Sequence, residues 1–190
     1  MNKINFLSEL IKKKQFDKAK IECEKIIKKE EKNFEFLNIF AIVLFSLKEY
    51  ENSLEKWKLA LKINAKYFDG NNNLGSALLG FEKYNDALIY LIKAAEIKSD
   101  IYELHHKIGY AYQSLNEIEK ALESYNKVLE LKCDYLPTIK NKFILLKKTN
   151  KFSEAITELD KLLIFDDDKV KAHIQKGEIY SNLNNSKEAI

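Results

Sequence analysis

The sequence predicts an all-α protein, a solenoid of helix-turn-helix repeats with about eleven helices. Two observations carry this prediction: a small residue returns every 34 positions, and apolar residues at helical spacing lie on both sides of it. The small-residue series consists of Ala19, Ser53, Ala87, Ala121, Ala155 and Ala189. The chain is also poor in helix breakers, since its 190 residues include one proline and five glycines.

The 34-residue period runs through the chain without an insertion or a deletion, so it divides the sequence into repeat units. We predict one repeat domain over 1–190, with the units 1–33, 34–67, 68–101, 102–135, 136–169 and a partial sixth, 170–190. The sixth unit stops inside its second helix. We therefore expect a truncated repeat, or a chain that continues into further repeats.

Each unit is predicted to contain two helices joined by a short turn. In the third unit the two apolar stripes are Leu74, Ala77, Leu78 and Phe81, then Ala87, Leu88, Leu91, Ala94 and Ala95. Asn85 is predicted to cap the second helix with its side chain, as are Asp17 and Ser153 in the first and fifth units. Polar turns should separate the units at 98–100, 132–134 and 166–168.

The basic residues limit the class of partner. All 32 of them are lysine, so no guanidinium is available for bidentate contact with a phosphate or a guanine edge. The formal net charge is only +3, and both signs are mixed along the chain. This composition argues against a specific nucleic-acid partner.

The cysteines and the apolar segments predict a cytoplasmic protein without a membrane span. Cys23 and Cys133 show no metal-ligand spacing and are predicted to be buried, reduced thiols. The N-terminus lacks the apolar run of a signal peptide. The apolar run at 39–45 is too short to cross a bilayer and should form a buried helix.

The repeat pattern resembles the tetratricopeptide repeat, a helix-turn-helix unit of the same length. A small residue at the eighth position is matched by Ala41, Gly75, Gly109 and Gly177, and a large one in the second helix by Trp57, Leu91, Tyr125 and Leu159. Gly75 and Gly109 should let the two helices of their units approach closely. Leu7 and Phe143 replace the small residue, so we expect the helices of the first and fifth units to splay.

The resemblance also implies a right-handed superhelix with a concave groove. In this family the first helix of each unit lines the groove, and the groove holds extended or helical peptide segments. The inward positions give these candidate peptide-binding residues: Asn38, Ile42, Asn72, Asn73, His106, Lys107, Tyr110, Lys140 and Asn141. A carboxamide can both donate to and accept from a peptide backbone. The alternative interpretation is that these are ordinary solvated residues of an Asn-rich sequence.

Catalytic and metal-binding motifs are not supported by the sequence. Residues 70–76 contain a GxxxxG spacing but lack the Lys-Ser/Thr that a phosphate loop requires. His105 and His173 lie two repeats apart, and His105 and His106 diverge on a helix, so neither pair predicts a metal site. No nucleophile with a partner base can be assembled. We therefore expect no enzymatic activity, no metal and no cofactor.

Three functional hypotheses follow. The first is a non-catalytic protein–protein interaction scaffold that binds a peptide segment of a partner. The second is a homo-oligomer formed through exposed repeat ends, and the third is the repeat region of a larger enzyme whose catalytic part lies beyond residue 190. A two-carboxylate clamp of the kind found in tetratricopeptide co-chaperones is disfavoured, because Glu103 stands where that clamp requires a lysine.

Overall fold

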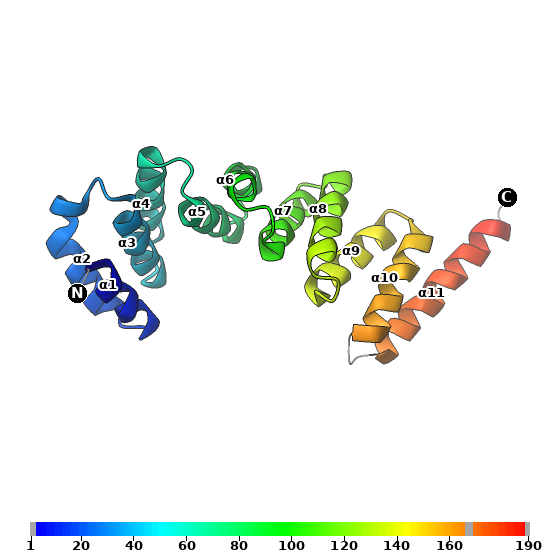
Figure 1. The fold of residues 1–190 in the computed structure, drawn as a ribbon. Coiled ribbons are helices and arrows are strands. Elements are labelled where there is room, and N and C mark those ends of the chain that lie inside the picture. The colour runs from blue at the N-terminus through cyan, green and yellow to red at the C-terminus, as the bar shows by residue number, and fades with distance from the viewer. Residues whose placement is uncertain (1–2, 166–168, 189–190) are drawn as a thin grey trace. The chain divides into compact units, whose positions relative to one another are not determined.

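The computed structural model describes residues 3–165 and 169–188 (Figure 1). Within these ranges there are eleven α-helices and no strand, so the predicted all-α class and the helix count are confirmed. The expected turn at 166–168 and the small residue Ala189 lie outside the described residues. No helix in the described part of the chain is both long enough and apolar enough to cross a membrane.

The chain divides into two compact units, Met1–Ser99 and Asp100–Ile190, and the division falls in the turn between the third and fourth repeats. The first unit contains α1 (Lys3–Lys12), α2 (Phe16–Glu30), α3 (Phe34–Ser46), α4 (Tyr50–Ile63), α5 (Phe68–Gly80) and α6 (Tyr84–Ile97). The second contains α7 (Tyr102–Ser114), α8 (Ile118–Leu131), α9 (Leu136–Lys148), α10 (Phe152–Phe165) and α11 (Lys169–Glu188). The helices α1 to α10 form five helical hairpins, each made of an odd-numbered helix and the even-numbered helix that follows it.

The small residues of the repeat are packing sites, as the period predicts. Ala87, Ala121 and Ala155 are completely buried. A Cβ atom added to Gly75 would lie 2.8 Å from Leu91 Cγ, and one added to Gly109 would lie 2.6 Å from Tyr125 Cδ1. Real Cβ atoms do not approach other atoms so closely, because packed interiors leave no such overlap. The helices of these two hairpins therefore require glycine at this position.

The first and fifth hairpins are less tightly packed. Contacts between α1 and α2 and between α9 and α10 are sparser than those between α5 and α6, in agreement with the larger residues Leu7 and Phe143. The last repeat differs from the predicted pattern, because α11 is continuous from Lys169 to Glu188 instead of turning before Ser186.

The turn inside each hairpin is closed by backbone hydrogen bonds. In the second repeat Lys48 has a φ of 64°, and its neighbour Glu49 donates its N–H to the carbonyl of Leu44 at 2.9 Å. This is the Schellman ending of a helix, with the left-handed residue just after the last helical turn. The equivalent residues in the other four hairpins, Lys14, Glu82, Asn116 and Asn150, also have positive φ.

The predicted side-chain caps at this turn are wrong. Helix α6 begins at Tyr84, and its N-cap is Lys83, which makes no side-chain cap hydrogen bond. Asn85 therefore lies inside the first turn, because the Schellman bonds start the second helix two residues earlier than expected. Asp17 and Ser153 lie within α2 and α10 in the same way. The side-chain cap that the structure does show is Asn33, which accepts from the N–H groups of Glu35 and Phe36.

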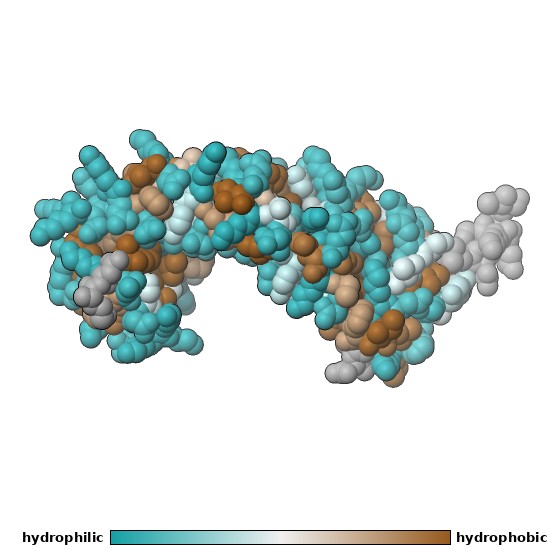
Figure 2. All heavy atoms as spheres, in the orientation of Figure 1, coloured by the Kyte–Doolittle hydropathy of each residue, from teal (hydrophilic) through white to brown (hydrophobic). Residues whose placement is uncertain are grey.

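The cores of the two units are apolar, while charged side chains cover much of the surface. Figure 2 shows hydrophilic side chains over most of the face in view, with apolar ones emerging in separate small groups. Cys23 is buried, as predicted, and burial raises the pKa of its thiol to about 12. Cys133 is exposed, so that part of the prediction is wrong: it stands in the polar turn before α9 and has no packing role.

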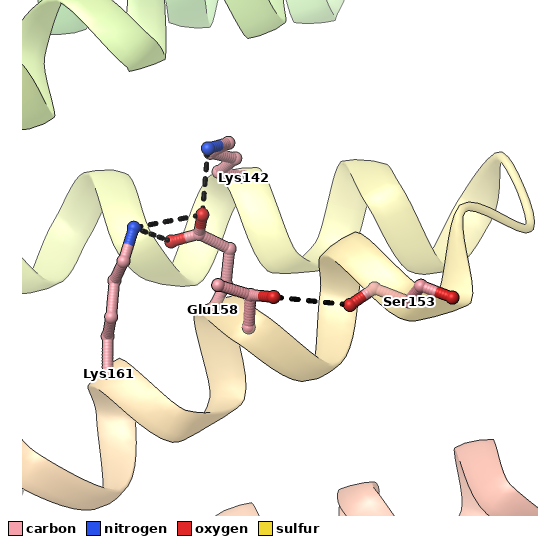
Figure 3. A network of polar contacts seen from close by, with 5 residues as sticks. Lys142, Ser153, Glu158 and Lys161 are labelled. Atoms are coloured by element: carbon pink, nitrogen blue, oxygen red, sulfur yellow. Dashed lines mark hydrogen bonds and ion pairs between the residues drawn. The ribbon is translucent and has the colours of Figure 1, made fainter.

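One ion cluster is buried in the second unit. The Glu158 carboxylate is 3% exposed and lies 2.7 Å from Lys142 Nζ and 3.0 Å from Lys161 Nζ (Figure 3). Lys142 occupies a repeat position that is filled by buried Leu74 in the first unit and by Ile108 in the fourth repeat. A lysine at a core position is tolerated here because the buried carboxylate neutralises it.

Candidate functional site

In the first unit, the predicted groove residues form a connected hydrogen-bond network. Asn38 is only 5% exposed, and its Oδ1 accepts from Trp57 Nε1 at 2.9 Å and from Asn73 Nδ2 at 3.0 Å. Its Nδ2 donates to the Tyr67 hydroxyl at 3.2 Å. Asn38 therefore joins α3, α4 and α5 rather than presenting its carboxamide to solvent.

A hollow of about 280 Å³ lies next to this network. Its lining comes from α3, α4 and α5 and consists of Ile42, Phe45, Ser46, Trp57, Asn73, Ser76 and Ala77. The lining is mainly apolar, with the hydroxyl groups and the Asn73 carboxamide as its polar part. Such a combination is typical of sites that bury an apolar group while fixing its orientation through a few polar contacts.

Two of the predicted site residues, Ile42 and Asn73, line this hollow, whereas Asn38 lies beneath it. Asn72 lies on α5 one residue before Asn73 and is half-buried. Sequence reasoning placed Trp57 in the core alone, and did not foresee that its ring also borders the hollow. The sequence did offer a signal, because Trp57 is its one tryptophan. In the structure the Trp57 ring lies beside that of Phe45, with ring centroids 5.7 Å apart.

In the second unit, the equivalent positions carry a different network. His106 Nδ1 lies 2.7 Å from Thr138 Oγ1, which links α7 to α9. The Tyr125 hydroxyl donates to Gln113 Oε1 at 2.6 Å, and Asn141 Nδ2 reaches that hydroxyl at 3.5 Å. Burial lowers the pKa of His106 and raises the pKa of Tyr125, because both charged forms would lose solvation.

The remaining predicted residues of the second unit lie on the solvent side of α7 and α9. Tyr110 and Lys140 are exposed, and Lys107 is half-buried. Burial lowers the pKa of Lys107, while the charge of Glu103 opposes this shift. These positions carry cations and an aromatic ring, in contrast to the amides of the first unit.

The described residues contain no group of three or more His, Cys, Asp or Glu side chains that could hold a metal ion. His105 is half-buried on α7, and His173 is exposed on α11.

Comparison with known proteins identifies the class. The tetratricopeptide repeat family model matches residues 102–134, which is the fourth repeat. The same residue pattern recurs through the other units at a constant spacing, so the tetratricopeptide repeat fold is not confined to the matched residues. A search of curated proteins gives no match to this sequence.

Solved structures with the same fold support this class. The protein YrrB, described as a tetratricopeptide repeat protein with an unusual peptide-binding site, superposes with a TM-score of 0.81 at 20% identity. The match covers 92% of this chain and 90% of YrrB. MamA from Desulfovibrio magneticus RS-1 gives a TM-score of 0.79 at 18% identity, over 87% of this chain and 96% of MamA. At these identities the similarity establishes the fold.

Proposed function

We propose that this chain is a non-catalytic interaction module that binds a peptide segment of a partner protein, with an apolar side chain of that segment anchored in the hollow of the first unit. The single observation that carries the proposal is the hollow itself, bordered by Ile42, Phe45 and Trp57. Buried aromatic and aliphatic pockets contribute most of the binding energy in protein interfaces. The proposal places the partner in a cytoplasmic setting, as the sequence predicts.

The polar groups around the hollow suit a peptide backbone. Asn73 donates one amide N–H to Asn38 Oδ1 at 3.0 Å, and that bond holds the orientation of its carboxamide. A fixed carboxamide loses little conformational entropy when a ligand binds, so it favours affinity. The peptide-binding site described for YrrB gives a precedent on the same fold.

The test begins with a peptide-display selection against the intact chain. Binding of the selected peptides is then measured for Ile42→Glu, which puts a charge into the hollow. We expect affinity to fall by at least about tenfold, equivalent to roughly 1.4 kcal/mol. The matched control is Ile89→Glu, the same change at an exposed site on the second helix α6, which should bind as the parent does.

Two outcomes would contradict the proposal. Equal binding by Ile42→Glu and the parent would remove the hollow from the binding site. An equal loss in Ile42→Glu and Ile89→Glu would show that the effect is one of general charge rather than of the hollow. Circular dichroism of both variants establishes that the helices are retained.

A second candidate function, self-association, is favoured by α11. Gly177 occupies the repeat position of Gly75 and Gly109, but a Cβ atom on it would meet no described atom within 4 Å. Ile174 and Tyr180 on the same helix are exposed. Sedimentation at micromolar concentration should show a dimer that Ile174→Glu converts to a monomer. A parent chain that stays monomeric would exclude this candidate.

A further inference from the structure

Two clefts of similar size lie at equivalent repeat positions of the first unit. One has a volume of about 470 Å³ and is lined by Glu31, Lys32, Leu59, Lys62 and Ile63. The other has a volume of about 460 Å³ and is lined by Ala65, Lys66, Lys93, Glu96 and Ile97. Each residue of the second set follows its counterpart in the first by 34 positions, so the two clefts are one repeated feature of the surface.

Each cleft lies between the end of a second helix and the turn that precedes the same repeat. In the α4 cleft, Leu59, Lys62 and Ile63 come from α4, while Glu31 and Lys32 come from the turn after α2. The α6 cleft is built in the same way from the end of α6 and the turn after α4. The described lining residues include none from a first helix, so both clefts are separate from the hollow beside Trp57.

An isoleucine at the end of each helix gives each cleft an apolar patch. Ile63 is the last residue of α4 and is 42% exposed, and Ile97 is the last residue of α6 and is 37% exposed. A single exposed isoleucine is ordinary on a protein surface. Here it borders a cleft that the side chain of a partner can enter, so binding there would bury more of its apolar area.

The charged residues of the clefts do not neutralise one another. Within residues 3–165 and 169–188, the charged lining residues of the two clefts form no ion pair. In α8, by contrast, Lys127 and Glu130 occupy the repeat positions of Lys93 and Glu96 and pair at 3.1 Å. The charge at one position is also reversed between the clefts, because Lys62 of the α4 cleft corresponds to Glu96 of the α6 cleft.

We propose that the two clefts form a self-complementary surface that binds a second copy of this chain, with the α4 cleft of one copy facing the α6 cleft of the other. A two-fold axis between the clefts repeats every contact, as in other isologous dimers. Lys62 of one copy then faces Glu96 of the other, and Glu31 faces Lys93. Ile63 and Ile97 cover each other across the interface.

Charge complementarity favours a second copy over a partner of a single charge sign. Each cleft is lined by two lysines and one glutamate, so a uniformly acidic or basic partner would place like charges together in both clefts. A second copy carries the same mixture with Lys62 and Glu96 exchanged. Exposed ion pairs contribute little stability, so the charges would mainly set the orientation, while the apolar residues stabilise the contact.

The experiment measures the dimer dissociation constant of the intact chain by analytical ultracentrifugation. We expect the parent to dimerise, and Lys62→Glu or Glu96→Lys alone to weaken the dimer by at least about tenfold, because each change opposes two like-charged pairs across the two-fold axis. The double variant Lys62→Glu with Glu96→Lys restores opposite charges at both pairs and should regain the parental affinity. An equimolar mixture of the two single variants should form a heterodimer for the same reason.

The matched control is Glu130→Lys, the same charge change at the same repeat position of α8, which should alter the dimer affinity by less than about threefold. A parent chain that stays monomeric, or a double variant as weak as the single ones, would overturn the proposal. A dimer that Ile174→Glu dissociates and Lys62→Glu does not would also overturn it, because the interface would then lie on α11. Ile42→Glu should dimerise as the parent does, so this test is independent of peptide binding in the hollow.

Discussion

The two units build equivalent polar networks at identical repeat positions but with different side chains. Asn38, Trp57 and Asn73 of the first unit correspond to His106, Tyr125 and Asn141 of the second. In the first unit the asparagine accepts from both partners, whereas in the second the tyrosine hydroxyl is the centre. The repeat backbone thus fixes where a polar junction forms, and the side chains decide how it is made.

Side-chain size at two repeat positions accounts for the hollow of the first unit. Its lining residues Ser76 and Ala77 correspond to Ile144 and Leu145 in the second unit. Small side chains at these two positions border the hollow beside Trp57, whereas the second unit carries larger side chains at the equivalent positions. The surfaces of the two units therefore differ through side-chain size and charge at a few positions, on a constant helical frame.

The largest effect should come from the ion cluster around buried Glu158 in the second unit. Glu158→Ala leaves Lys142 without its carboxylate and should lower the free energy of unfolding by ~3–5 kcal/mol. Lys142→Leu together with Glu158→Tyr copies Leu74 and Tyr90 of the first unit. Urea unfolding of this double variant should recover most of the loss. If Glu158→Ala were as stable as the parent, Glu158 would not be needed to neutralise Lys142.

A smaller loss of stability is expected at the repeat position where both units carry a buried glycine. Gly75→Ala and Gly109→Ala should each reduce stability by ~1–3 kcal/mol, since the new methyl group meets Leu91 or Tyr125. Gly80→Ala is the matched control, because a Cβ atom there meets nothing within 4 Å, and it should stabilise α5 by up to ~1 kcal/mol. Thermal denaturation would show the three shifts, and a loss in Gly80→Ala alone would contradict the assigned packing.

The smallest effect concerns pH and distinguishes His106 from its counterpart Asn38. The pKa of His106 is lowered in the folded chain, so the folded state binds fewer protons than the unfolded state below pH ~6.5. Stability from the neutral imidazole is complete above that pH and is lost as the pH falls below it. His106→Asn should reduce this acid loss, measured as the change in urea midpoint between neutral and mildly acidic pH. An unchanged pH dependence would assign the loss to other groups.

Much of the fold could be predicted because it follows from local patterns. The 34-residue period, the two helices of each unit and the notches at Gly75 and Gly109 depend on which residues are small and apolar. The turns were harder to predict from the sequence, because Lys48 and Glu82 adopt positive φ although neither residue type favours it. The backbone bonds of the turn, and not a side-chain cap, determine where the second helix starts.

The candidate site was predicted only in part. Ile42 and Asn73 both line the hollow, but the burial of Asn38 depends on Trp57 of α4 and on Tyr67 in the turn before α5. The hollow depends on atoms that are missing at Ser76 and Ala77, and a single sequence gives no direct signal for unfilled space. The buried Glu158 was likewise hidden, because its partner Lys142 breaks an otherwise apolar repeat position.

The most direct test of the central claim is to give the first unit the side chain of the second. Ser76→Ile copies Ile144 and should fill the hollow without lowering the melting temperature. We expect display-selected peptides to bind Ser76→Ile with at least about tenfold lower affinity than the parent. The control variant Ser114→Ile, on α7 of the second unit, should bind these peptides with unchanged affinity. Undiminished binding by a folded Ser76→Ile variant would contradict the claim that the hollow of the first unit anchors the partner.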